Sequence, residues 1–189
     1  MAMVDVRLEP MTEDEYKPWR EAVEVQYAES IAASGRSAED AARQSAEAYA
    51  QLLPDESATP GHHFWYAYDS DRQDGDRQES DRQDGDGRDG DGQEGDRQDR
   101  DDHRGGDRRV GFLWVKVTDN AAFIYNIAVE PDVRRSGYGR AIMLAAERWC
   151  RDNALTRIGL HVFAHNTGAR ALYEQLGFLE TGRNLAKNL

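Results

Sequence analysis

Residues 129–141, VEPDVRRSGYGRA, have the composition of a turn that binds an anion such as a phosphate. An apolar, strand-like segment precedes the turn, and an amphipathic segment with helical spacing follows it. The first N–H groups of a helix lack partners within the helix and carry a partial positive charge, so they bind anions readily. Gly137 and Gly139 have no Cβ atoms to keep a phosphate from the backbone. An ordinary turn would explain these glycines, but not the arginines at 134, 135 and 140.

Two common nucleotide-binding motifs are absent from the sequence. No run matches G-x-x-x-x-G-K-[ST], which a P-loop requires. The stretch GYGRAI, residues 137–142, lacks the third glycine of the dinucleotide-binding G-x-G-x-x-G fingerprint. The anion that the turn binds therefore belongs to another kind of ligand.

Two stretches together resemble a known family, the GNAT N-acetyltransferase superfamily. Residues 129–141 are similar to its acetyl-CoA signature, which is an apolar strand, Val-x-Pro, and then [Arg/Gln]-x-x-Gly-x-[Gly/Ala]. Residues 165–178, HNTGARALYEQLGF, resemble its second motif through Asn166, Ala169, Leu172, Tyr173 and Gly177-Phe178. The resemblance implies an α+β fold with a mixed, mostly antiparallel central sheet flanked by helices. Its central parallel strands, FIYNIAV (123–129) and IGLHVF (158–163), would be splayed apart.

The same resemblance implies that acetyl-CoA is a co-substrate and that no metal is needed. The pantetheine arm would pair with the backbone of residues 127–129, and the pyrophosphate would sit on the N–H groups of residues 135–141. The implied cofactor-binding set is Ile127, Ala128, Val129, Arg134, Arg135, Ser136, Gly137, Tyr138, Gly139, Arg140, Ala141, Asn166, Ala169 and Tyr173. Asn166 also suits a helix N-cap, a role compatible with cofactor contact.

Acetyl transfer to an amine needs a proton for the leaving thiolate and removal of a proton from the amine. The resemblance makes Tyr173 the general acid; the alternative is a helix tyrosine packed at the core edge. Asn126 and Ala128 stand where many family members carry an acidic residue. The candidate bases are His161, His165 and Tyr125, the last acting through water. Alternatively, no residue acts as a base and the unprotonated fraction of the amine reacts directly. Glu130 follows the strand but can face outward.

The predicted function is an acetyl-CoA-dependent N-acetyltransferase acting on a primary amine of a small molecule or protein. The missing carboxylate leaves open a non-catalytic acyl-CoA-binding module, and an interaction protein using its acidic loop is a third reading. The first helical region is acidic, which would attract a cationic amine, unless the charges form a solvated helix face; these residues are Glu13, Asp14, Glu15, Glu21, Glu24 and Glu29. Tyr27, Trp65 and Tyr125 are candidates to line an apolar acceptor pocket, or to pack in the core.

The elements that must position these residues follow from periodicity. Strands are predicted at 4–8, 62–69, 110–119, 121–129 and 157–163, with one or two more within 177–189. Helices are predicted near 13–33, 38–53, 139–153 and 167–177. Thr12 and Glu15 can form a capping box for the first helix. Pro18 requires either that the helix starts at Lys17 or that it is kinked.

Composition sets the remaining expectations for the 189 residues, taken as a single domain. Residues 69–109 are predicted to be a disordered acidic Asp/Arg/Gln/Gly loop inserted between two strands, because residues 69–107 contain no apolar side chain to bury. The repeats in it do not match a calcium loop, since Arg88 falls on a ligand position. A net charge of −12 argues against nucleic acid and anionic lipid. A single cysteine and the lack of a long apolar run predict a cytoplasmic protein, monomeric or homodimeric.

Overall fold

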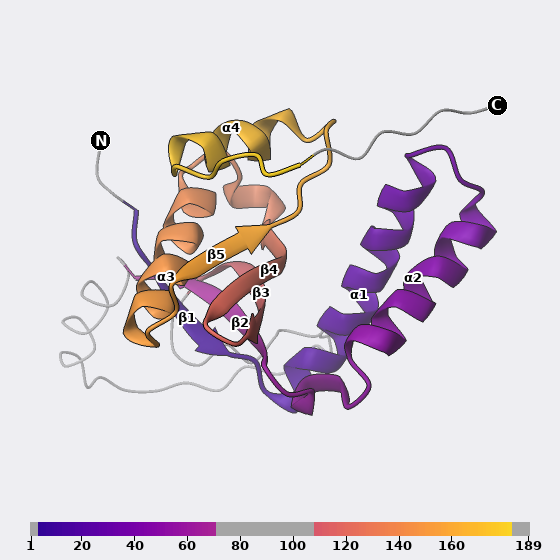
Figure 1. The fold of residues 1–189 in the computed structure, drawn as a ribbon, viewed down its shortest axis with the longest axis horizontal. Coiled ribbons are helices and arrows are strands. Elements are labelled where there is room, and N and C mark those ends of the chain that lie inside the picture. Colours follow the sequence, from indigo (N-terminus) through magenta and orange to yellow (C-terminus); the bar gives the residue numbers. More distant parts are fainter. Residues whose placement is uncertain (1–3, 71–107, 183–189) are drawn as a thin grey trace, which may run out of the picture.

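The computed structural model describes residues 4–70 and 108–182. Most of the predicted disordered insert, and the end of the predicted C-terminal strands, lie outside the described residues. Figure 1 shows a central sheet with helices on both sides. The elements are β1 (Val6–Pro10), α1 (Glu13–Ala32), α2 (Ala38–Leu52), η1 (Glu56–Ala58), β2 (His62–Asp69), β3 (Arg109–Thr118), β4 (Ala121–Val129), η2 (Pro131–Val133), α3 (Tyr138–Asp152), β5 (Arg157–Leu160) and α4 (Thr167–Gln175).

The sheet has five strands in the order β1-β2-β3-β4-β5. The first three pairings are antiparallel and the last, between β4 and β5, is parallel. The parallel pairing ends at Ile124 and Leu160, whereas β4 continues to Val129. The two parallel strands therefore separate beyond Ile124, and the predicted α+β fold with a mixed sheet and splayed parallel strands is confirmed.

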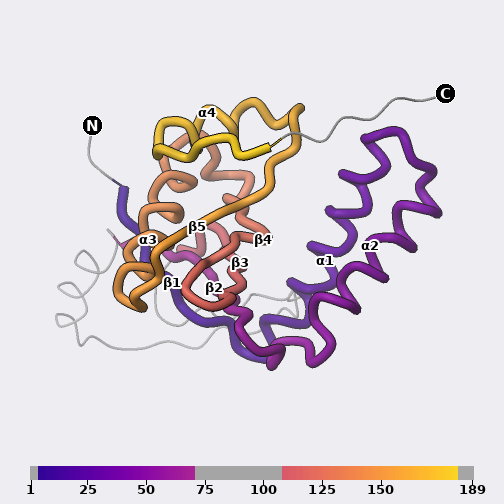
Figure 2. The backbone as a smooth tube through the Cα atoms, viewed as in Figure 1, coloured from indigo at the N-terminus to yellow at the C-terminus, as the bar shows by residue number. Residues whose placement is uncertain are grey.

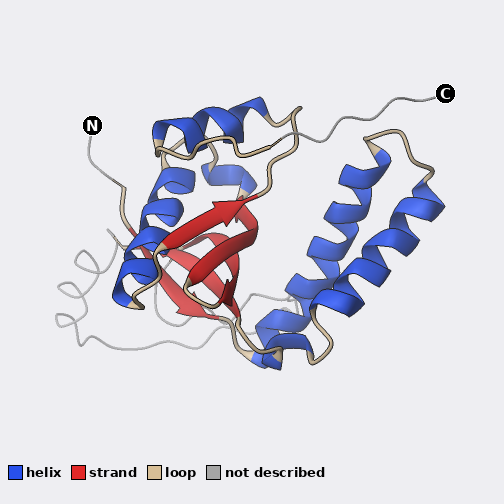
Figure 3. Cartoon of the chain, in the orientation of Figure 1, coloured by secondary structure: helices blue, strands red, loops and turns tan. Residues whose placement is uncertain are grey.

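Alternation along the strands divides the core into two clusters, one on each face of the sheet. On one face, Leu113 and Val115 of β3 pack with Ile142 and Met143 of α3, and all four are buried. The second motif's helix, α4, adds Tyr173 to this cluster. Figure 3 shows α3 and α4 lying apart from the α1–α2 hairpin, with the strands between them.

The other face carries an aromatic cluster beneath α1 and α2. Trp114 of β3 is 1 % exposed and packs among Tyr16, Trp19 and Tyr49 of the two helices and Phe64 of β2. Trp19 meets both Phe64 and Trp114 edge-on, with ring centroids 5.2 and 5.8 Å apart. Aromatic burial of this kind contributes strongly to stability, so the hairpin is held firmly against the sheet. Figure 2 traces α1 and α2 as antiparallel neighbours on that side.

A bulge in β4 changes the register at the point where β4 leaves β5. Trp114 pairs with Asn126, but the next residue of β3, Val115, pairs with Ile124, so Tyr125 is an extra residue. A bulge turns consecutive side chains away from strict alternation. Tyr125 stacks on Trp114, with ring centroids 4.9 Å apart. The bulge thus directs the Tyr125 ring to the α1–α2 face.

The ends of the predicted insert are more ordered than expected. Asp69 belongs to β2 and Arg109 to β3, so the boundaries 69 and 109 are wrong: both residues pair as strands. The Asp69 N–H donates to the Arg108 carbonyl at 3.0 Å, so the two strand ends lie side by side. Residues 71–107 lie outside the described residues.

Two further expectations about the elements need correction. The Thr12–Glu15 capping box is present, and α1 starts at Glu13 and includes Pro18, so a start at Lys17 is wrong. Within the described part of the predicted C-terminal strand region, residues 177–182, no strand forms. Within residues 4–70 and 108–182, every helix is too short or too polar to cross a bilayer.

Candidate functional site

The predicted anion turn lies between β4 and α3. Gly137 is the N-cap of α3 with φ of 96°, a left-handed conformation that glycine adopts without strain. No side chain in the described structure caps this helix end, and its first turn contains no acidic residue. Helix ends without such a cap need another acceptor for their N–H groups. The local geometry is therefore that of an anion-binding helix N-terminus.

The arginines of the turn have separate placements. The Arg134 Nε atom donates to the Val129 carbonyl at 3.1 Å, linking the turn to the end of β4. The Arg135 guanidinium lies near the start of α4, 3.8 Å from where a Cβ on Gly168 would stand. The N–H groups of Arg140 and Ala141 donate to the Gly137 carbonyl at 3.0 and 3.1 Å. Those two predicted pyrophosphate donors are therefore engaged within α3.

Tyr138 differs from the other residues of the turn because its side chain faces inward. Its hydroxyl donates to the Asp69 carboxylate at 2.6 Å, and both side chains are buried. Gly139 packs against α4, the helix of the second motif: a Cβ atom added at Gly139 would lie 3.4 Å from the Cδ2 atom of Leu172. The side chain of Tyr138 cannot reach a ligand at the turn, which leaves only its backbone for the predicted cofactor role.

The predicted pantetheine-binding segment, residues 127–129, forms the part of β4 beyond its last pair with β5. Its other side pairs with β3 through Leu113, Phe112 and Gly111. Among the described residues, β4 has no strand neighbour on the β5 side after Ile124. An extended ligand can use such an edge as a strand partner would.

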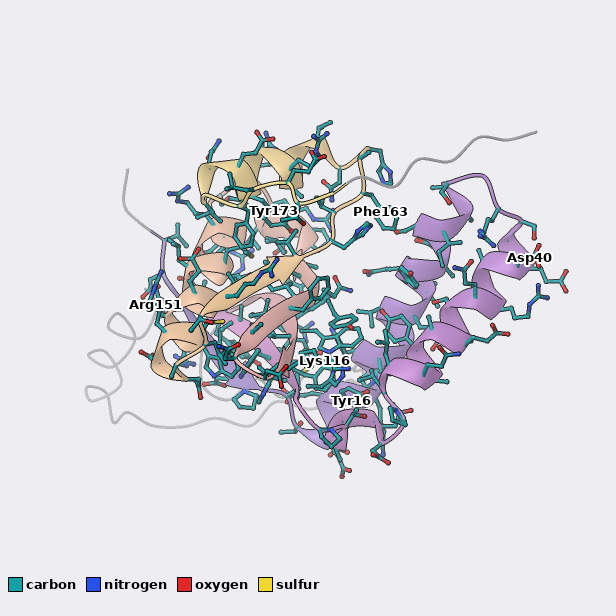
Figure 4. The ribbon with its side chains drawn as sticks, viewed as in Figure 1. Tyr16, Asp40, Lys116, Arg151, Phe163 and Tyr173 are labelled. Atoms are coloured by element: carbon teal, nitrogen blue, oxygen red, sulfur yellow. The ribbon has the colours of Figure 1, made fainter. Side chains whose placement is uncertain are left out.

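Tyr173 lies on α4, above the splay of β4 and β5, and Figure 4 labels it there. The side chain is 9 % exposed, and burial raises the pKa of its hydroxyl above the ordinary 10.0. The phenol therefore stays protonated at neutral pH, as a proton donor must. Its ring also packs near Phe178, with centroids 5.8 Å apart, so the core-edge role holds as well.

Asn166 is the N-cap of α4, as its sequence context suggested. Its Oδ1 atom accepts the Ala169 N–H at 3.2 Å. The Asn166 side chain is exposed and lines a cavity between the α1–α2 hairpin and the splayed strands. Its Nδ2 group is therefore available to a ligand in that cavity. The cap orients both Asn166 and Ala169 at the start of α4.

A cavity of about 430 Å³ separates α1 and α2 from the splayed strands. Its lining includes the predicted Tyr27 and Tyr125, together with Tyr173. Trp65 does not belong to it: this ring lies on the opposite face, 4.8 Å from the Trp149 ring, because residues 64 and 65 point to opposite sides of β2. None of the six acidic residues predicted to attract a cationic amine lines the cavity.

Two of the candidate bases, Tyr125 and His161, line this cavity. Asn126 lines it where an acid was expected, while Glu130 turns away to pair with Arg109, whose Nε atom is 3.1 Å from its Oε1. His161 lines the cavity, and His165 does not. Among the described lining residues there is no carboxylate, and His161 is the sole imidazole.

Sequence reasoning missed much of the cavity lining, including the aromatic residues Tyr49, Trp114, Phe123 and Phe163. Phe163 follows β5, and Figure 4 shows it between α4 and the α1–α2 hairpin. The helical spacing around Tyr49 and the strand alternation around Trp114 predict only that both residues lie in the core. No local pattern marks a core aromatic that also borders a cavity. In the described chain, no group of three or more His, Cys, Asp or Glu residues is placed to hold a metal ion.

The chain belongs to the acetyltransferase (GNAT) family, whose model matches residues 37–178. It is 28 % identical over 189 aligned residues to the uncharacterized N-acetyltransferase YycN from Bacillus subtilis (strain 168), covering 97 % of this chain and 99 % of YycN. It is 40 % identical over 78 residues to a mycothiol acetyltransferase from Kocuria rhizophila, which covers 38 % of this chain and 26 % of that protein.

Solved structures agree with the fold. The crystal structure of YycN superposes with a TM-score of 0.74 at 28 % identity, covering 97 % of this chain and 98 % of YycN. An acetyltransferase structure from Pyrococcus furiosus has a TM-score of 0.56 at 19 % identity, over 98 % of this chain and 100 % of that one. The second likeness concerns the fold alone.

Proposed function

We propose that the protein transfers the acetyl group of acetyl-CoA to a primary amine. The observation that carries the proposal is the position of Tyr173. This buried, protonated hydroxyl lines the cavity at the place where β4 has separated from β5. A proton donor between an open strand edge and a cavity suits a reaction that joins two substrates arriving from opposite sides.

The residues present fit acetyl-CoA. The edge of β4 at Ile127, Ala128 and Val129 holds the pantetheine amides, and the start of α3 holds the pyrophosphate. Arg135, Ser136, Gly137, Tyr138 and Gly139 supply backbone N–H groups there, since those of Arg140 and Ala141 are engaged within the helix. Arg134 braces the turn through its bond to the Val129 carbonyl. Asn166 and Ala169, which are joined by the cap of α4, would contact the ligand at the start of that helix. Acetyl-CoA supplies the activated acetyl group as a thioester.

The chemistry then needs two proton transfers. The amine nitrogen bonds to the acetyl carbon as the bond from that carbon to sulfur breaks. Tyr173 donates its phenolic proton to the departing thiolate. His161 accepts the proton that the amine loses, directly or through one water, because the described cavity lining offers no carboxylate.

Relatives support the amine class without naming the acceptor. Besides mycothiol acetyltransferases, the chain is 38 % identical over 74 residues to a [ribosomal protein bS18]-alanine N-acetyltransferase from Salmonella typhimurium, covering 39 % of this chain. A small-molecule amine and a protein amine are both represented. The alternative function, a non-catalytic acyl-CoA-binding module, is favoured by one observation: Asn126 occupies the wall where an acid was expected.

Calorimetry with acetyl-CoA and a thiol-release assay with primary amines test the proposal. We expect sub-millimolar binding, steady thiol release, and a fall of about 100-fold in kcat in Tyr173→Phe with little change in acetyl-CoA affinity. Tyr68→Phe, a half-buried β2 tyrosine outside the cavity, is the matched control. Binding without turnover would favour the non-catalytic module, and no binding would exclude both.

A further inference from the structure

One wall of the cavity is a continuous row of aromatic rings from four elements. Tyr27 of α1 meets Tyr49 of α2 at 6.0 Å between centroids, and Tyr49 meets Trp114 of β3 at 5.6 Å. Trp114 stacks on Tyr125 of β4 at 4.9 Å, and Tyr125 meets Phe123 edge-on at 5.1 Å. Every member of this aromatic wall lines the cavity. Tyr49 and Trp114 are only 4 % and 1 % exposed, so they back the wall. A flat apolar group would pack on the more exposed rings of Tyr27, Tyr125 and Phe123.

The charge around the aromatic wall does not suit a polycation. The carboxylate of Glu24, one turn before Tyr27 on α1, is held by the Arg20 guanidinium, and Glu29, two residues after Tyr27, is exposed and does not line the cavity. That guanidinium also lies 4.2 Å from the centre of the Tyr49 ring, so a positive charge stands against the wall. Burial raises the pKa of Tyr49 to about 12 and raises that of Tyr125 as well, so both rings are neutral. An acceptor with several ammonium groups would find no carboxylate in the described lining.

Size and polarity narrow the acceptor further. A volume of about 430 Å³ lies at the small end of ligand sites, and the reacting acyl group must share it. Apart from tyrosine hydroxyls, the polar side chains of the lining are those of Gln26, Ser30, Asn126, His161 and Asn166, and none of them is a carboxylate. They can orient an amine by hydrogen bonds without neutralising a charge.

We propose that the acceptor is an aralkylamine: a primary amine joined by a short alkyl chain to one aromatic ring, with no second charge. The aryl ring packs on the aromatic wall, and the amine points toward Tyr173 and His161. This inference rests on the proposed acetyltransferase function. It excludes polyamines, aminosugars and lysine side chains of proteins as preferred acceptors.

The first experiment compares kcat/KM for 2-phenylethylamine, n-butylamine, spermidine and a lysine-containing tetrapeptide at saturating acetyl-CoA. We expect 2-phenylethylamine to exceed each of the others by about tenfold, the value of one favourable ring contact. A preference for spermidine or the peptide would overturn the aralkylamine proposal and leave the acetyltransferase function standing. Calorimetric binding of 2-phenylethylamine without thiol release from any amine would overturn the acetyltransferase function and leave the aromatic wall only as a binding site for such amines.

The second experiment uses Tyr27, the outermost ring on α1, which is half-buried. Tyr27→Leu should lower kcat/KM for 2-phenylethylamine about fivefold and leave that for n-butylamine within about twofold. Tyr27→Phe keeps the ring and should retain the wild-type preference. An equal loss for both amines in Tyr27→Leu would show a merely structural role for Tyr27 and overturn its place in the acceptor site.

Discussion

The two halves of the proposed site, one for the cofactor and one for the acceptor, are built differently. The cofactor half, from the end of β4 through the start of α3, offers mainly backbone groups from one short stretch of chain. The acceptor half is a set of side chains from α1, α2, β3, β4 and the segment after β5. A ligand site made of backbone groups requires particular backbone conformations, so it is marked by glycines in the sequence. A ligand site made of side chains uses apolar residues whose sequence pattern does not differ from that of core residues.

Of the variants that follow, we expect the largest change in binding or activity from one that strains the backbone of the cofactor half. Gly137→Val should raise the dissociation constant of acetyl-CoA about 100-fold, because a β-branched residue resists the φ of 96°. Calorimetry measures the affinity, and thermal unfolding checks that the chain still folds.

Gly137→Asn is the matched control. Asparagine tolerates the left-handed region better than valine does, and a Cβ at this position has room, with Val4 Cγ2 at 3.7 Å. We expect its affinity to fall only a few-fold. Equal losses in the two variants would show that backbone conformation is not what the turn contributes.

A smaller effect is expected in the acceptor half, from its proposed base. His161→Gln should lower kcat/KM about 50-fold, while acetyl-CoA affinity stays the same. His165→Gln serves as control, since His165 stacks on Phe163 at 5.4 Å but does not line the cavity. Wild-type activity in His161→Gln would assign proton removal to solvent.

The acceptor half should also be the acid-sensitive one, through His62 beneath the aromatic wall. Its Nδ1 atom accepts the Trp114 Nε1–H at 2.9 Å, which requires an unprotonated Nδ1. Burial first, then Lys116 and His63, lowers the pKa of His62 from 6.5 to about 4. Between these values the unfolded chain binds more protons, so stability is lost as pH falls through that window.

From pH 7 to pH 4.5 we expect His62 to cost about 2 kcal/mol in the free energy of unfolding. Denaturant titrations of the wild type and His62→Gln at both pH values measure it. The glutamine can still accept from Trp114, so its pH dependence should be flatter, with a residual contribution from His63, whose pKa burial also lowers. Equal slopes for both proteins would contradict the assignment.

We expect the smallest change in acetyl-CoA affinity from deleting residues 71–106. The strand ends are already joined by the Asp69–Arg108 hydrogen bond, so Ser70 and Asp107 can close the hairpin as a short turn. We propose that one GNAT domain carries this acidic segment as an insert, since a segment without apolar side chains adds little to a core. Acetyl-CoA affinity should stay within about twofold of wild type, and the variant should unfold no more easily than wild type, because closing a shorter loop costs less entropy. Collapse of the fold would contradict the proposal.

Much of the fold was predictable because its determinants are local. The capping box at Thr12, the strand alternation around Trp114 and the glycine turn at Gly137 each lie within a few residues of the element that they specify. Errors and open alternatives arose where tertiary packing decides. The sequence left Trp65 either in an acceptor pocket or in the core, and its position in β2 turns it to the core on the α3 face. Residues 177–182 were predicted as strand but found no partner in the described structure.

The sequence by itself determined the family, the order of the elements and the glycine turn that starts α3. A helix N-terminus and a left-handed glycine are properties of consecutive residues. Only the tertiary structure decided the composition of the acceptor cavity. The bulge at Tyr125 and the packing of α1 and α2 bring distant aromatic rings into one wall. The same packing leaves the acidic residues of α1 outside the cavity, since which face of a helix meets the sheet depends on the partner as well as the helix.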